Sequence, residues 1–179
     1  MGQVYQFKVA LKHRKTLWRR IEIEGAQTLK DFDRIIRRAF RHDPLDHLSE
    51  FYRGQVWKAG GLGEINPSGG GPGAKKRIDR LDLAEGDKLE YVYDFGDDIQ
   101  HVITLEKITE PAEAGAYPRI IAQNKPQYHY CEVCDQEGKK TVATWLCIAC
   151  SEEEGRFVYL CEDCLDEEHE DHYAEEVVY

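Results

Sequence analysis

Four ligand pairs, CEVC (131–134), CIAC (147–150), CEDC (161–164) and HEDH (169–172), decide the fold of the C-terminal part of the chain. Each CxxC pair turns the chain within a knuckle and directs two sulfurs at one point, which supplies half of the tetrahedral shell of Zn²⁺. All six cysteines belong to these pairs, so none is left for a disulfide or a catalytic thiol. Eight ligands therefore predict two zinc ions per chain.

The order of the pairs favours a cross-braced arrangement, in which the first pair joins the third and the second joins the fourth. If neighbouring pairs joined instead, the third and fourth pairs would have to close one site across only residues 165–168. Four residues are a short connection for closing one tetrahedral site, but the spacing alone does not decide between the two pairings. The first site is predicted to comprise Cys131, Cys134, Cys161 and Cys164, and the second Cys147, Cys150, His169 and His172.

The residues between the pairs fit strands and a helix around these knuckles. Residues 141–146 and 156–160 are rich in β-branched and aromatic side chains and lead into a CxxC pair, as strands do. The run CEDCLDEEHEDH has helical composition, which places His169 and His172 at i and i+3 near the end of a short helix. This order, with the tail AEEVV, resembles the ZZ-type zinc finger, a cross-braced relative of the treble clef, over about residues 130–178. The HxxH pair departs from the longer histidine spacing of that finger.

A redox or disulfide module is the alternative interpretation of the cysteines. The chain opens with MGQVYQFKVALK, which alternates like a strand instead of forming an apolar leader, so we expect a cytoplasmic protein with reduced thiols. No apolar run approaches membrane-spanning length, and we expect no membrane partner. About fifty residues with this much charge have little apolar surface, so the metal is expected to take part in folding.

Length and charge divide the chain of 179 residues into a domain at 1–125 and a zinc module at 126–179. Residues 1–80 contain 17 basic and 9 acidic side chains, whereas residues 131–179 contain 3 basic and 15 acidic ones. Such an acidic module repels phosphate backbones and attracts basic peptides. The composition of the module therefore favours a basic protein segment as partner. The acidic side chains and aromatic residues such as Trp145 and Tyr159 would contact that segment. Alternatively, the acids only solvate a small metal-bound unit.

The N-terminal region predicts an α+β domain, a mixed or antiparallel sheet with a packed helix. Residues 4–12 and 17–25 alternate like strands, and Thr28 with Asp31 resembles a capping box at the start of a helix over 29–41. Opposite the apolar side of that helix lies a basic face, which is either simply solvated or a nucleic-acid-binding surface. Its members are Lys30, Arg34, Arg37, Arg38 and Arg41. Residues 58–76 contain seven glycines and two prolines and predict a flexible loop.

Two alternating runs on either side of a GDD cluster predict a hairpin over residues 88–105. Together with LWRRIEI and HLSEF, the sequence YVYDFGDDIQHVITLEKI resembles the Ri-plasmid open-reading-frame-three-like family, over about residues 4–122. The resemblance implies an α+β fold but no established activity. The chain departs from the family pattern at Ile99, where an aromatic is typical, and in the tail after residue 124, which the zinc module replaces. A resolvase label used for such proteins finds no support, because no serine lies among arginines near paired helices.

The hairpin also contains the strongest candidates for catalysis. Within residues 94–101 lie Asp94, Asp97, Asp98 and His101. Carboxylates and an imidazole can bind a divalent metal or transfer protons, so a metal-dependent hydrolase is one interpretation. Strand parity separates Asp94 from His101, however, and aspartates are common in turns. A non-enzymatic adaptor is therefore favoured over a hydrolase, and the oligomeric state stays open.

Overall fold

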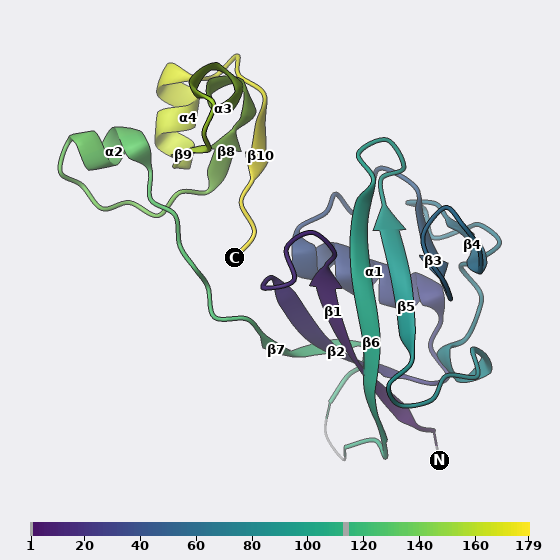
Figure 1. Cartoon of the computed structure of the whole chain (residues 1–179). Helices are drawn as coiled ribbons and strands as arrows, with labels where there is room; N and C mark the ends of the chain where they lie inside the picture. Colours follow the sequence, from purple (N-terminus) through teal and green to yellow (C-terminus); the bar gives the residue numbers. More distant parts are fainter. Residues whose placement is uncertain (1, 113–114) are drawn as a thin grey trace. The chain divides into compact units, whose positions relative to one another are not determined.

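The computed structural model describes residues 2–112 and 115–179 (Figure 1). The chain divides into two compact units, Met1–Asn124 and Lys125–Tyr179. The first unit contains, in chain order, β1 (Val4–Leu11), β2 (Trp18–Glu24), α1 (Leu29–Phe40), β3 (Ser49–Tyr52), β4 (Gly61–Ile65), the 3₁₀ turn η1 (Ile78–Arg80), β5 (Lys88–Tyr93), β6 (Ile99–Thr109) and β7 (Arg119–Gln123).

The strands of the first unit form one antiparallel sheet in the order β4-β3-β5-β6-β1-β2-β7. Helix α1 lies across one face of this sheet (Figure 1). Strand alternation directs apolar side chains to that face, where Phe7, Phe32, Phe51 and Tyr91 are fully buried. The ring centroids of Phe7 and Phe32 are 4.9 Å apart, and those of Phe32 and Phe51 are 5.4 Å apart. The expected α+β class is confirmed.

Helix α1 begins with the predicted capping box. The backbone N–H of Thr28 donates to the carboxylate of Asp31 over 2.9 Å, and the Thr28 hydroxyl donates to the same oxygen over 2.8 Å. This satisfies a donor at the helix start and places a negative charge at the positive end of the helix dipole. The helix ends at Arg41, which takes a left-handed conformation with φ 57°. The chain then turns into the loop 42–48.

The glycine-rich segment differs from the expected flexible loop. Gly61–Ile65 forms β4, which pairs with β3, and the N–H of Gly73 donates to the carbonyl of Glu64 over 3.1 Å. A Cβ atom at Gly73 would lie only 2.0 Å from the carbonyl oxygen of Gly63. Glycine is needed here because two backbone segments approach closely, so the prediction of a flexible loop was wrong.

The second unit contains α2 (Glu132–Gln136), β8 (Trp145–Cys147), α3 (Ile148–Glu154), β9 (Val158–Leu160), α4 (Glu162–Glu168) and β10 (Ala174–Glu176). Its strands form an antiparallel sheet in the order β10-β8-β9. Helix α4 is shorter than predicted: it ends at Glu168, His169 is its C-cap, and His172 lies in a turn closed by a 2.8 Å hydrogen bond from its own N–H to the carbonyl of His169. Helix α3 was not predicted.

Candidate metal centres

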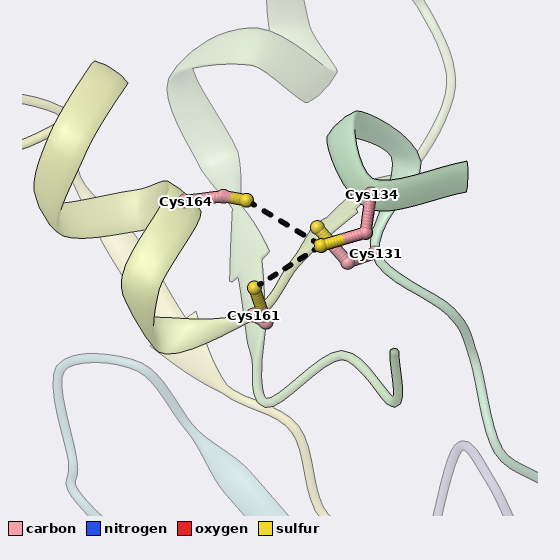
Figure 2. Close-up of side chains that lie close together, drawn as sticks. All are labelled: Cys131, Cys134, Cys161 and Cys164. Atoms are coloured by element: carbon pink, nitrogen blue, oxygen red, sulfur yellow. Dashed lines mark hydrogen bonds between the residues drawn. The ribbon is translucent and has the colours of Figure 1, made fainter. Parts of the chain in front are cut away.

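The first cluster joins the knuckle at α2 to the start of α4. Cys131 and Cys161 are the N-cap residues of these two helices, so each CxxC pair places its second cysteine one turn into a helix. Figure 2 shows the four sulfurs converging, with the Sγ of Cys134 3.8 Å from that of Cys161 and 3.7 Å from that of Cys164. Four sulfurs at about 2.3 Å from a tetrahedral Zn²⁺ lie about 3.8 Å from one another. The separations thus fit one tetrahedral ion.

The second cluster joins the knuckle at α3 to the two histidines. The Sγ of Cys150 lies 3.4 Å from Nδ1 of His169 and 3.3 Å from Nδ1 of His172, and the two Nδ1 atoms are 3.3 Å apart. The Sγ of Cys147 lies 3.4 Å from Nδ1 of His172. Tetrahedral Zn²⁺ with Zn–S of about 2.3 Å and Zn–N of about 2.0–2.1 Å requires N···N of about 3.3 Å and S···N of about 3.6 Å. The short HxxH spacing therefore still delivers both ring nitrogens to one point.

The structure thus brings together all eight predicted ligands, in the cross-braced arrangement. In each cluster, the candidate ligand atoms all lie within 4.8 Å of one another. Among residues 2–112 and 115–179, these two are the sole groups of three or more such ligands. The chain therefore carries two clusters that can hold metal ions.

Electrostatics inside the clusters favours a bound cation. Burial raises the pKa of Cys150 to about 11, aided by the neighbouring thiol of Cys147. Burial and the neighbouring sulfurs likewise raise the pKa of Cys164. Burial opposes ionisation of Cys131 too, but hydrogen bonds from the backbone N–H groups of Cys134 and Cys161 lower its pKa overall. Several thiolates can share such a small volume only when a cation compensates them, which is the usual effect of a metal on a coordinating thiol.

The clusters also form the core of the second unit. Cys131 and Cys147 are completely buried, and they pack with Val158 and Leu160 in one apolar cluster. Few other apolar side chains of this unit are buried, so the ligands occupy the place of a hydrophobic core. Metal binding and folding of this unit are therefore expected to be coupled.

The acidic hairpin does not form the predicted catalytic group. His101 is fully buried on the face of the sheet that packs against α1, where its ring contacts Phe40, and its Nε2 lies 3.1 Å from Nε2 of His42. Asp94 has a left-handed φ of 55° and accepts the backbone N–H of Gly96 over 2.9 Å, as a turn residue does. Asp98 accepts hydrogen bonds from Trp57 and Gln100, while Asp97 is exposed in the turn. The acids stabilise the hairpin turn while the imidazole faces the core, so these four side chains do not converge on one point as a hydrolase site would require.

One of the five residues predicted to form the basic face of α1 is buried instead of exposed. Arg37 is 2% exposed and forms a buried ion pair of 2.9 Å with Asp33. Arg34, Arg38 and Arg41 are exposed, and Lys30 is half-buried. The basic face is therefore narrower than predicted, because Arg37 turns towards the loop 42–48 and not towards solvent.

The exposed aromatic residues of the second unit also differ from the expectation. Trp145 and Tyr159 are half-buried in the small sheet. The most exposed aromatic side chains of this unit are Phe157, at 67%, and Tyr173, at 65%, ahead of Tyr128 and Tyr130. Phe157 directly precedes β9, and the strand-like run that contains it gave no sign that its side chain would lie outside the sheet.

The fold and the clusters define an α+β protein with a large antiparallel sheet, followed by a small unit that can bind two metal ions. The chain belongs to the plasmid pRiA4b ORF-3-like protein family, whose model matches residues 3–138. The match confirms the family resemblance seen in the hairpin and extends through the first CxxC pair.

Among solved structures, the chain is similar to a protein of unknown function from Methanosarcina mazei Go1. The two share 31% sequence identity with a TM-score of 0.56, over 69% of this chain and 70% of that chain. No curated protein matches the chain. Among the residues that the structure describes, none of the helices has the length and apolar character needed to cross a membrane.

Proposed function

We propose that this protein is a zinc-binding adaptor without enzymatic activity, whose acidic second unit binds a basic segment of another protein. Soft thiolate and imidazole donors in tetrahedral clusters are typical of structural zinc sites, and fully occupied shells leave no open position for a substrate. In this proposal Zn²⁺ fixes the unit, and the chain's own surface residues make the contacts.

The arrangement of the elements supports a treble-clef unit of the ZZ type. One pair of cysteines comes from a knuckle, and the other comes from the first turn of α4, directly after the β8–β9 hairpin. The second cluster takes its two cysteines from the junction of β8 and α3, where the N–H of Ile148 donates to the carbonyl of Tyr173 over 2.9 Å. Such units are rigid platforms for peptide segments.

The observation that carries the proposal is an exposed aromatic side chain on a strongly acidic surface. Phe157 borders a hollow of about 350 Å³ that is also lined by Ile148 and Glu152. Arg156 lines the same hollow, but its guanidinium is neutralised by Glu132 at 2.7 Å. With 15 acids against 3 basic residues over 131–179, the surroundings attract cations, and the exposed phenyl ring offers a contact for an apolar side chain or a cation.

Binding of a labelled lysine- and arginine-rich peptide to the zinc-loaded full chain, followed by fluorescence anisotropy, tests the proposal. Phe157→Ser should weaken binding about tenfold, the effect of losing about 1.4 kcal/mol of contact energy. Tyr173→Ser is the matched control, because its aromatic side chain is equally exposed but lies outside this hollow. Binding should weaken as salt increases.

A second pair of variants tests the charge contribution. Glu152→Gln with Glu153→Gln removes two acids near the hollow, whereas Asp166→Asn with Glu167→Gln removes two exposed acids on α4. Only the first pair should weaken binding markedly. If the peptide fails to bind at ~50 mM salt, or if both pairs weaken it equally, the acids only solvate the unit and the proposal is wrong.

A further inference from the structure

The outer side of α1 borders a second hollow, which lies wholly within the first unit. It has a volume of about 670 Å³, within the ~300–1,000 Å³ typical of ligand clefts. Arg34 and Arg38 line it from the helix, Pro44 and Leu45 from the following loop, and Pro118 from the segment before β7. Leu45 is 83% exposed, so the hollow is open along its rim and suits a chain segment better than an enclosed small molecule.

The charge of this groove is positive, although two aspartates also line it. Asp31 accepts the hydrogen bonds of the helix cap, and Asp33 is paired with the buried guanidinium of Arg37. Arg34 and Arg38 are exposed, and neither forms an ion pair within the part of the chain that the structure describes. The charged side chains that line the groove sum to +1, with Arg34, Arg37 and Arg38 against Asp31 and Asp33, and the exposed ones are the two arginines at 34 and 38.

The apolar wall of the groove is held in place from beneath. Arg37 donates hydrogen bonds to the backbone carbonyls of Asp43, Asp46 and His47, over 3.2, 2.7 and 3.1 Å. These bonds fix the loop on both sides of Leu45, whose N–H donates to the Asp43 side chain over 2.7 Å. Because the loop backbone is already held, only the side chain of Leu45 has to be ordered when it meets a partner, which reduces the entropy lost on binding.

We propose that this groove binds an acidic peptide segment of a partner protein. Carboxylates of the segment would pair with Arg34 and Arg38, and one large apolar side chain would pack against Pro44 and Leu45. This surface lies on the other unit from the acidic surface described above and has the opposite charge, so it adds a second partner class. Charged bidentate pairs beside an apolar contact are typical of peptide anchors.

The lining favours a peptide over a nucleic acid. Single strands bind through rows of cations combined with aromatic side chains on which bases stack. Among the described residues that line the groove there is no Phe, Tyr or Trp, and the imidazole of His42 is already stacked on Tyr93 with ring centroids 4.4 Å apart. The basic face of α1 therefore serves as the charged half of a mixed surface.

Fluorescence anisotropy of the zinc-loaded full chain with a short labelled peptide, rich in glutamate and containing one leucine, tests this proposal. Arg34→Gln with Arg38→Gln should weaken binding by about tenfold or more, because the charged hydrogen bonds to the carboxylates of the peptide are lost. The matched control is Arg14→Gln with Lys15→Gln, which removes the same charge from exposed positions in the β1–β2 turn. The control should bind within about twofold of the unchanged chain, since only long-range attraction is altered.

Leu45→Ser separates the apolar contribution. Leu45 is largely solvent-exposed, so the Leu45→Ser variant stays folded, and it should weaken peptide binding several-fold. A peptide with serine in place of its leucine should bind the unchanged protein as weakly as the original peptide binds this variant. Equal losses in the control pair, or no response to Leu45→Ser, would overturn the proposal.

Two further outcomes would assign the groove differently. Tighter binding of single-stranded RNA than of the peptide, lost in Arg34→Gln with Arg38→Gln, would make the groove a nucleic-acid site. Concentration-dependent self-association seen by sedimentation, lost in the same variant, would make a second copy of this chain the occupant. Either result contradicts a peptide partner.

Discussion

Replacement of Arg37 by methionine should destabilise the first unit by about 3–5 kcal/mol, the usual effect of removing one partner from a buried ion pair. The guanidinium donates to Asp33 over 2.9 and 3.1 Å, and to Ser49 and three loop carbonyls. In Arg37→Met, Asp33 keeps hydrogen bonds from the hydroxyls of Ser49 and Tyr91 but loses its counter-charge. The loop carbonyls are only partly buried and regain water, so the uncompensated carboxylate dominates the loss.

Urea unfolding measures this effect in a Trp145→Phe background, where fluorescence reports only Trp18 and Trp57 of the first unit. The control Arg38→Met removes an equal charge from an exposed neighbouring position and should change stability by less than about 0.5 kcal/mol. Adding Asp33→Leu to Arg37→Met should recover part of the loss, since the buried charge is then gone. If Arg37→Met proves no more harmful than Arg38→Met, Arg37 is solvated, as its place on the helix predicted, and the reasoning fails.

Three further predictions concern proton binding, metal pairing and backbone packing. Burial and the nearby guanidinium of Arg37 lower the pKa of His42 from 6.5 to about 4, so between these values the unfolded chain binds a proton that the folded chain does not. His42 should therefore contribute up to about 1.4 kcal/mol per pH unit to a loss of stability towards pH 4, and the buried His101, whose pKa is also lowered, adds to that loss. His42→Phe should reduce the slope in urea titrations without abolishing it. Cys134→Ser and Cys164→Ser should each lower the metal content from two ions per chain to one, as measured by elemental analysis. The double variant should also retain one ion, because both cysteines belong to the same site. Loss of both ions from the double variant would contradict the cross-braced pairing. Gly73→Ala should cost about 1–3 kcal/mol because its Cβ meets a carbonyl. Gly2→Ala, where no described atom lies within 4 Å of the added Cβ and φ is not positive, should be nearly neutral, and equal urea midpoints for the two variants would refute the close approach at Gly73.

The ligands of both clusters could be predicted from the sequence because their chemistry is rare and their spacing is local. Two cysteines separated by two residues direct their sulfurs to one point whatever the rest of the chain does. The position of His172 after the helix could not be predicted, since helix composition continues past Glu168 while the metal geometry requires a turn. The strands and α1 of the first unit were predictable from periodicity, but the sheet order was not, because strand pairing depends on contacts distant in sequence.

Arg37 and Gly73 illustrate what periodicity and composition miss. Arg37 lies at the edge of the apolar side of α1, where a helix position is buried or exposed depending on what packs beside it. The loop 42–48 covers this edge and supplies carbonyl acceptors, so an arginine becomes a core residue. Glycines such as Gly73 have the same composition signal in a flexible linker and in a tightly packed turn, and only the neighbouring backbone decides between the two.

The two units hold their surfaces in different ways, and this determines how each surface should respond to metal. In the first unit, the loop that presents Leu45 is fixed by a buried ion pair over a large apolar core, with none of the eight candidate ligands involved. In the second unit, α3 carries two ligands, Cys147 as its N-cap and Cys150 within its first turn, and the sulfurs replace a hydrophobic core. Removal of the metal should therefore disrupt the acidic surface around Phe157 while the groove on α1 persists. Binding of a basic peptide is expected to depend on metal availability, and binding of an acidic one is not.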